Sequence, residues 1–374
     1  MPCPYTIAAI ASLALLQGPT IPLDSGWQLS GEGSRIEEFR GAPAILMRTG
    51  TAVRPDVALR DGTLEFDVWM VPGRTFIYVH FRMASEEEHE EIYFRPHKAT
   101  LPDAVQYSPV WNGDSNWQLW HGPGGTAAVP FPRDDWMHVR IVMQGRRAAL
   151  FLGGSSTPAM LITLGREPAA GHIGFGAFTP RGGAPDGPVA AIRNVVVRPD
   201  NVPYAFAPDS GSRIPAGLVR QFQLSPPVQL EEEPINSLGE TRLRGRERWR
   251  SYATEPNGVL VIGRHLKRPS PLAGAIARLV VRAERDTVQP MRLGFSDYIT
   301  VFVNGRPLFS GDAHYSFDVP RQEGLIALSQ ATAWLPLRRG DNEILLAVSD
   351  GFGGWGLMAQ LDPAPGVRVV AAQP

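Results

Sequence analysis

One stretch of the sequence decides the fold class: Asp61-Gly62-Thr63-Leu64-Glu65-Phe66-Asp67-Val68-Trp69-Met70. Apolar side chains recur at every second position of this stretch, from Leu64 to Met70, and Glu65 and Asp67 fall between them. Successive side chains of a β-strand point to opposite faces, so a period of two predicts a strand with one face in a core. The stretch therefore predicts a half-buried β-strand.

The same period of two recurs along most of the chain. It appears at residues 76–81, 91–95, 137–143 and 148–152, and again at 259–262, 277–282, 298–303 and 343–348. Turn sequences such as Gln144-Gly145-Arg146 and Asn304-Gly305 separate the runs. No segment offers the long helical crossover that a parallel sheet requires, so the sequence predicts an all-β protein made of antiparallel β-sandwiches.

Length and composition indicate how many domains to expect. A chain of 374 residues is longer than one hydrophobic core normally holds. Its 39 glycines and 35 prolines are too many for a helical protein. We predict a signal peptide over residues 1–23, a first sandwich over 24–199, a proline-rich linker over 200–247 and a second, jelly-roll sandwich over 248–374.

Charge and cysteine content exclude several classes of protein. The 36 basic and 37 acidic residues leave a net charge near zero, without the positive field of a nucleic-acid-binding protein. No interior apolar run is long enough for a membrane span. Cys3 is the only cysteine, which excludes an intramolecular disulfide. The apolar run 7–16 predicts export to an extracytoplasmic location; a disordered start or an apolar first strand is the alternative.

Two groups of segments resemble known families. Gly26-Trp27 and residues 61–68, 136–140 and 171–175 resemble the concanavalin-A-like lectin and glucanase sandwich, close to laminin-G-like modules and to the sugar-hydrolase-like domains of secreted bacterial proteins. Residues 297–309, 340–346 and 353–356 resemble the galactose-binding-like jelly roll attached to many glycosidases. Both resemblances imply a carbohydrate-related role outside the cytoplasm.

The resemblance to glucanases directs attention to Glu65-Phe66-Asp67. Glucanases of this fold carry two glutamates around an aspartate on one strand, and retaining hydrolysis needs a pair of carboxylates. The second glutamate is missing here, because Val68-Trp69-Met70 follows. The alternative interpretation of the motif is a solvated strand face.

Residues 86–125 form the preferred ligand site. Sugar recognition needs flat apolar rings and fixed polar groups, and this segment is rich in both. Alternation places Glu91, Tyr93 and Arg95 on one strand face, and Ile92 and Phe94 on the other. The alternative is that the rings pack the sandwich while the charged groups pair among themselves. The predicted ligand-binding residues are Tyr93, Arg95, His97, Gln106, Tyr107, Trp111, Asn112, Trp117, Gln118, Trp120 and His121.

For an enzyme, the candidate acids and bases are Glu90, Glu91 and Asp103, with His97 or Tyr93 as the proton-transfer partner. The run 89–93 is similar to the zinc-protease motif His-Glu-x-x-His, but it ends on Tyr93 and has the pattern of a strand, so it does not predict zinc. Asp114 lies in an oxygen-rich loop that would suit calcium, and a plain hairpin turn is the alternative. We expect no cofactor, with calcium as the alternative.

A secondary sugar site is predicted in the second sandwich from Asp297, Asn304, Arg306 and His314. The alternatives are a strand start at Asp297 and a contact between domains at Arg306. The function predicted for the whole chain is that of an exported carbohydrate-binding protein. A glycoside hydrolase or lyase and a protein-interaction module are the alternatives, and the sugar and the oligomeric state stay open.

Overall fold

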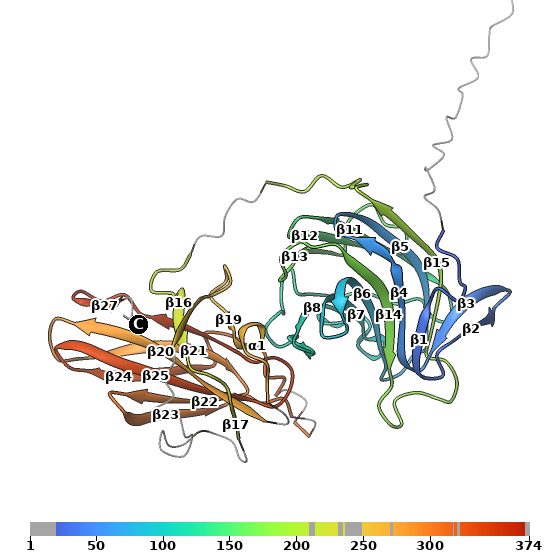
Figure 1. Cartoon of the computed structure of the whole chain (residues 1–374). Coiled ribbons are helices and arrows are strands. Elements are labelled where there is room, and N and C mark those ends of the chain that lie inside the picture. The colour runs from blue at the N-terminus through green and yellow to red at the C-terminus, as the bar shows by residue number, and fades with distance from the viewer. Residues whose placement is uncertain are drawn as a thin grey trace, which may run out of the picture.

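The computed structural model describes residues 20–208, 214–230, 235, 249–269, 272–316, 318–319 and 322–370. The signal-peptide prediction therefore lies outside the described residues except at its last four positions, and so does the acidic run 231–233 of the predicted linker. Figure 1 shows two β units, each built from two antiparallel sheets. The predicted all-β class is confirmed.

The first sandwich contains an eight-stranded sheet that we call the front sheet. Its strand order is β1-β4-β14-β6-β7-β8-β10, with β9 also paired to β8. The bounds are β1 (Gln28–Glu32), β4 (Thr49–Leu59), β14 (Gly171–Phe178), β6 (Phe76–Ser85), β7 (Glu88–Phe94), β8 (Val105–Trp111), β9 (Asp114–Ser115) and β10 (Thr126–Ala127).

The second sheet of this sandwich, the back sheet, has seven strands in the order β13-β12-β11-β5-β15-β3-β2. They are β13 (Met160–Thr163), β12 (Arg147–Leu152), β11 (Met137–Gln144), β5 (Gly62–Met70), β15 (Ala190–Pro199), β3 (Ala42–Met47) and β2 (Arg35–Phe39). The stretch that opened the sequence analysis is β5. Leu64 and Phe66 are buried in one core with Val79 and Ile92 of the front sheet, which confirms the predicted inward face.

The second sandwich pairs an eight-stranded sheet with a four-stranded one. The larger contains β18 (Arg250–Ala253), β16 (Gln221–Leu224), β17 (Val228–Gln229), β20 (Ala273–Ala283), β25 (Gly340–Asp350), β22 (Tyr298–Val303), β23 (Arg306–Asp312) and β27 (Val367–Val370). The smaller contains β19 (Leu260–Val261), β26 (Gly356–Leu361), β21 (Thr287–Ser296) and β24 (Ala331–Leu337). Strands β16 and β17 lie within the stretch predicted as linker, and both pair with β20.

The two sandwiches meet where the loop after β8 reaches the second one. Figure 1 shows helix α1 (Ile262–His265) and β19 on that side of the second sandwich. Side chains from both units form one apolar cluster: Trp111, Leu119, Val259, Val261, Ile326 and Met358. No helix in the described part of the chain has both the length and the apolar character needed to span a bilayer.

Candidate functional site

The candidate site lies on the outer face of the front sheet, the face turned away from the core. Two neighbouring rows of residues cross β14, β6, β7 and β8 there. Their members, by strand register, are Gly174, His80, Glu91 and Ser108 in the first row, and Gly176, Tyr78, Tyr93 and Gln106 in the second. Ile92 and Phe94 of β7 point the other way, into the core. The alternation predicted for residues 91–95 is therefore confirmed.

Gln106 is the centre of a buried polar network on this face. Its Oε1 accepts hydrogen bonds from the Tyr93 hydroxyl at 2.8 Å and from the Arg95 guanidinium at 2.6 Å. Its Nε2 donates to the carbonyl oxygens of Trp117 at 2.7 Å and Trp120 at 2.8 Å. Burial raises the pKa of Tyr93, so the phenol stays protonated and acts as a donor at neutral pH. The network holds this part of the face rigid.

Aromatic rings cover the accessible end of the same face. Tyr78 lies 5.4 Å from Tyr93 between ring centroids, and Phe76 lies 6.1 Å from Phe178 and 5.4 Å from His97. Phe178 is 46% exposed. Partial burial and, next, the neighbouring Arg95 lower the pKa of His97 to about 4, so its imidazole is neutral at pH 7. This end offers flat apolar surface to a ligand.

His80, His89 and Glu91 form a buried cluster beside these rings. Their exposed fractions are 7%, 5% and 5%. Glu91 Oε2 lies 3.7 Å from the Nε2 atoms of both histidines, and the two imidazole centroids are 4.6 Å apart. Burial lowers the pKa of His80 well below its usual value, and His89 adds to the shift. Among the described residues, His80 Nδ1 and both ring nitrogens of His89 have no hydrogen-bond partner.

Two serines orient the carboxylate of this cluster. The Ser115 hydroxyl donates to Glu91 Oε1 at 2.7 Å, and the Ser108 and Ser115 hydroxyls are hydrogen-bonded at 3.0 Å. One oxygen of Glu91 is thereby held by β9, while the other faces the imidazoles. Gly176 makes room for the ring of His80, because a Cβ there would lie 3.2 Å from His80 Cε1.

A hollow of about 430 Å³ adjoins this region at the far side of β14. Both rows continue across β14 into β4, where Val53 is opposite Gly174 and Thr51 is opposite Gly176. Gly174 and Gly176 carry no side chains, and Met83 and His80 of β6 pack over them. Polar groups supply much of its lining: Gln28, Ser30, Thr51, Ser85, Glu86 and His172.

The structure separates the eleven predicted ligand residues into groups. Tyr93, Arg95 and Gln106 form the network described above, and His97 is exposed beside Phe76. The remaining residues except Tyr107 belong to the loop that meets the second sandwich: Trp111, Asn112, Trp117, Gln118, Trp120 and His121. Sequence reasoning had no means of distinguishing these two environments, since both use aromatic and amide side chains.

Specific contacts hold that loop on the second sandwich. Asn112 Nδ2 donates to the Gly263 carbonyl at 2.8 Å, and His121 Nε2 lies 2.7 Å from the Ile326 carbonyl oxygen. The fully buried Gln118 accepts from the Ser296 hydroxyl at 2.8 Å and donates to the Glu323 carbonyl at 3.1 Å. These side chains are engaged by the second sandwich, a contact that neither alternative of the sequence analysis described.

Tyr107 and Glu90 lie in the interior of the first sandwich. The Tyr107 hydroxyl donates to Glu90 Oε2 at 2.5 Å and accepts from the backbone N–H of Gly165 at 2.5 Å. The backbone N–H of Arg166 donates to Glu90 Oε1 at 3.1 Å. Burial raises the pKa of Glu90, and its side chain is completely inaccessible. Both side chains are out of reach of a ligand bound from solvent.

The other candidate carboxylates are engaged in ion pairs. Asp103 pairs with Arg95 at 3.1 Å and with Lys98. Asp114, the calcium candidate, pairs with Arg268, whose other nitrogen lies 3.0 Å from Asp350. Asp114 therefore helps to join the two sandwiches.

The incomplete glucanase motif lies on the outer face of the back sheet. Glu65 pairs with Arg198 at 2.8 Å, and Asp67 accepts from Asn194 at 2.7 Å and contacts His138 at 2.9 Å. This arrangement matches the strand-face interpretation.

The four predicted residues of the secondary site form two separate pairs: the Asp297 carbonyl accepts from the backbone N–H of Ala313, the neighbour of His314, at 2.8 Å, and Asn304 is two residues before Arg306. Asp297 and Asn304 stand at opposite ends of β22, roughly 23 Å apart at about 3.3 Å per residue. Asp297 Oδ2 accepts from the backbone N–H of Gly351 at 2.9 Å. His314 contacts Asp312 at 2.6 Å. Asn304 lies in the turn that leads to Arg306.

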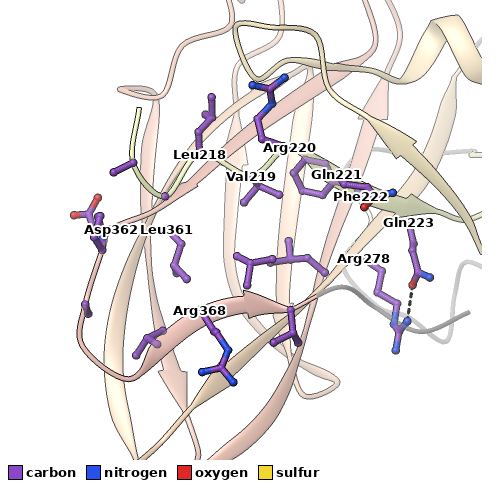
Figure 2. A pocket seen from close by; sticks show the side chains of 18 of the residues that line it. Leu218, Val219, Arg220, Gln221, Phe222, Gln223, Arg278, Leu361, Asp362 and Arg368 are labelled. Carbon is purple, nitrogen blue, oxygen red and sulfur yellow. Dashed lines mark hydrogen bonds between the residues drawn. The ribbon is translucent and has the colours of Figure 1, made fainter. Parts of the chain in front are cut away.

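A second hollow, of about 510 Å³, lies elsewhere on the second sandwich, between β16 and β27. Figure 2 shows Arg220 and Arg368 on its opposite sides, with Val219 and Leu361 between them and Gln223 bonded to Arg278. None of the four predicted secondary-site residues lines it.

Comparisons with known proteins establish no family for this chain. No family model matches the sequence, and no curated protein matches it. Among solved structures, the chain is similar to the carbohydrate-binding module CBM66 from Bacillus subtilis, with 14% identity, 48% of this chain and 99% of that chain covered, and a TM-score of 0.35. It is also similar to a Bacillus licheniformis beta-glucanase, with 14% identity, 49% and 97% covered, and a TM-score of 0.37.

A third similar structure is the apo Crh5 transglycosylase, with 15% identity, 50% and 82% covered, and a TM-score of 0.37. At such low identities and TM-scores, these likenesses establish nothing about ligand or activity.

The sequence analysis selected neither His80 nor Tyr78, and it compared the run that begins at His89 with a zinc motif but predicted no zinc there. A usable signal was present, because His89 and Glu91 are two residues apart on one strand and therefore share a face. His80 could be assigned to the same cluster only from the register of the β6–β7 pair, in which His80 lies opposite Glu91.

Proposed function

We propose that this protein binds a carbohydrate on the outer face of the front sheet. The observation that supports the proposal best is the group of aromatic rings on that face. Phe76 and Phe178 lie 6.1 Å apart, Tyr78 follows Phe76 on the same face of β6, and a polar hollow lies on this face beyond Gly174 and Gly176.

Such a face suits the chemistry of sugars. The C–H faces of a pyranose pack on aromatic rings, and its hydroxyls need fixed donors and acceptors. The hollow of about 430 Å³ falls within the range of about 300–1,000 Å³ that ligand sites usually have. Thr51 and Ser30, joined by a hydrogen bond of 2.6 Å, are among the hydroxyl groups that line it.

The proposal includes export, for which the apolar run at residues 7–16 is the support, and a carbohydrate-related role for the second sandwich, for which its resemblance to galactose-binding-like jelly rolls is the support. Both extend the central proposal without being needed for it. Binding at the outer face is the part that has a direct test.

A glycan array with the purified full chain tests the proposal. We expect binding of the wild type to at least one glycan, and loss of that binding in Tyr78→Ala and Phe178→Ala. Trp334→Ala is the matched control, because Trp334 is a 62% exposed aromatic residue on β24 of the other sandwich. Absence of binding to every glycan, or equal binding by Tyr78→Ala, would overturn the proposal.

Glycoside hydrolysis is the second candidate function, and the arrangement of Glu91 favours it. Ser115 fixes this carboxylate, and two imidazoles lie 3.7 Å from its free oxygen. In this function Glu91 is the acidic group, because it lies on the outer face of the front sheet, whereas Glu90 is bonded to Tyr107 in the interior. Reducing-sugar release by the wild type that is lost in Glu91→Gln would establish hydrolysis, whereas binding without release would establish a lectin.

A further inference from the structure

We infer that His80, His89 and Glu91 form a binding site for one divalent transition-metal ion of the zinc type. This inference goes beyond the proposed carbohydrate function and does not depend on it. Strand β6 supplies His80, and β7 supplies the other two ligands. No part of the sequence analysis assigned a metal to these residues.

The spacing of the three side chains suits a metal ion. One ligand atom from each lies within 4.8 Å of the other two, and the Glu91 Oε2 to imidazole Nε2 distances are both 3.7 Å. Zinc binds imidazole nitrogen at about 2.0–2.1 Å, so two ligands of a tetrahedral site lie roughly 3.4 Å apart. The two carboxylate–imidazole distances exceed this value by only about 0.3 Å.

The unpaired nitrogens are the second and independent observation. His89 is 95% buried, since its exposed fraction is 5%, and neither of its ring nitrogens has a hydrogen-bond partner within the part of the chain that the structure describes. A neutral imidazole carries one donor and one acceptor nitrogen, and buried polar groups are nearly always satisfied. A metal ion bound to Nε2 would satisfy the acceptor nitrogen of this buried imidazole.

A neighbouring hydroxyl already orients the carboxylate ligand. Ser115 donates to Glu91 Oε1 at 2.7 Å, which leaves Oε2 for the ion. Such outer partners normally fix the rotamer of a metal-binding carboxylate. Gly176 gives the His80 ring its place, because a Cβ there would approach His80 Cε1 to 3.2 Å.

The donor set decides the class of ion. Two imidazole nitrogens and one carboxylate oxygen suit zinc and its transition-metal neighbours, whereas calcium and magnesium prefer oxygen ligands throughout. Three protein ligands leave a coordination position for water or for a ligand group. The resulting ion would face the same surface as Tyr78, two residues before His80 on β6.

Metal content measured on the full chain tests the inference. The purified protein is stripped with a chelator, incubated with Zn²⁺ or Co²⁺, passed through a desalting column and analysed for metal. We expect one ion per chain in the wild type and complete loss of that ion in His80→Ala, His89→Ala and Glu91→Gln. His172→Ala is the control, since His172 is also a partly buried histidine of the front sheet with an unpaired Nδ1 but lies outside the cluster.

Two further readouts separate metal loss from misfolding. Glu91→Gln preserves the size of the side chain and its acceptor for Ser115, so circular dichroism should show a folded protein. Added Zn²⁺ should raise the melting temperature of the wild type and of His172→Ala but not that of Glu91→Gln. Co²⁺ should give visible absorption bands in the same two proteins only. A wild type that takes up no ion, or variants that keep it, would overturn the inference.

Discussion

His80 of β6 lies directly opposite Glu91 of β7, and its Nε2 is 3.7 Å from Glu91 Oε2. The pair places a carboxylate and an imidazole side by side on the outer face of the front sheet, which also carries aromatic rings. A cross-strand pair of this kind depends on the register of one hairpin.

Gly176→Ala should displace the imidazole of His80. The added Cβ would lie 3.2 Å from His80 Cε1, which is closer than ordinary packing allows. Overpacking of this kind typically costs about 1–3 kcal/mol. Urea unfolding should show that loss, and metal uptake should fall. Gly263→Ala is the control, because its new Cβ would meet its nearest neighbour at an ordinary 3.5 Å. Equal effects of both substitutions would contradict the prediction.

Arg268→Met should weaken the junction between the sandwiches. Arg268 contacts Asp114 of the first sandwich and Asp350 of the second, and the Asp350 side chain is only 2% exposed. Removing one partner of a buried ion pair costs about 3–5 kcal/mol, because the other charge stays buried. The free energy of unfolding in urea measures the loss. In contrast, Arg282→Met breaks the exposed pair with Asp341 and should leave the free energy of unfolding nearly unchanged.

Tyr107→Phe should destabilise the first sandwich without altering glycan binding. The substitution removes the hydrogen bonds to Glu90 and from Gly165, and a buried unsatisfied group costs about 1–3 kcal/mol. Thermal unfolding checks the loss, and the glycan array checks the unchanged binding. If binding fell while the protein remained folded, Tyr107 would belong to the site and not to the interior.

His265 should make the second sandwich less stable in acid. Burial and, next, Arg264 lower the pKa of His265 from its usual 6.5 to about 4. Because the folded-state pKa is the lower one, the unfolded chain binds more protons between these values. The stability contribution is therefore present above pH 6.5 and is lost as the pH falls towards 4. Allowing for partial exposure, we expect a loss of about 1–2 kcal/mol across this window.

The variant His265→Phe tests the pH prediction. It keeps a ring beside Tyr252, whose centroid lies 4.2 Å from the imidazole, but it does not titrate. Its free energy of unfolding should fall less than that of the wild type between pH 6.5 and pH 4. His138→Phe should change the pH profile in the opposite sense, because a hydrogen bond to Asp67 raises the pKa of His138. Identical profiles for the wild type and His265→Phe would refute the assignment.

Much of the fold is predictable from the period of two. In β5 and β7 the alternation identifies the core face correctly, because burial of Phe66, Ile92 and Phe94 is decided by local pattern and strand geometry. Strands β16 and β17 were missed, since they are short and lie among prolines. Their position depends on pairing with β20, which is a contact between distant parts of the chain.

The site was predictable only in part. The face that carries Glu91, Tyr93 and Arg95 follows from alternation within one strand. Trp111 and Gln118 were assigned to a ligand site, but they contact the second sandwich, and no local pattern distinguishes those roles. His80 joins Glu91 through the register of a hairpin that contains an irregularity between Phe81 and Ser85. A register of that kind is set by the folded hairpin as a whole.

The apolar cluster shared by the two sandwiches limits how the protein can be dissected. Trp111 and Leu119 of the first unit are only 5% and 3% exposed because Val261, Ile326 and Met358 of the second unit cover them. A first sandwich expressed alone would expose these side chains to water as a contiguous hydrophobic patch. Surfaces of this kind promote aggregation. The loop that carries them also supplies the carbonyl oxygens that hold Gln106. Expressing the first sandwich alone would therefore lower its solubility and also disturb the outer face of the front sheet. The two sandwiches should be studied together in one chain.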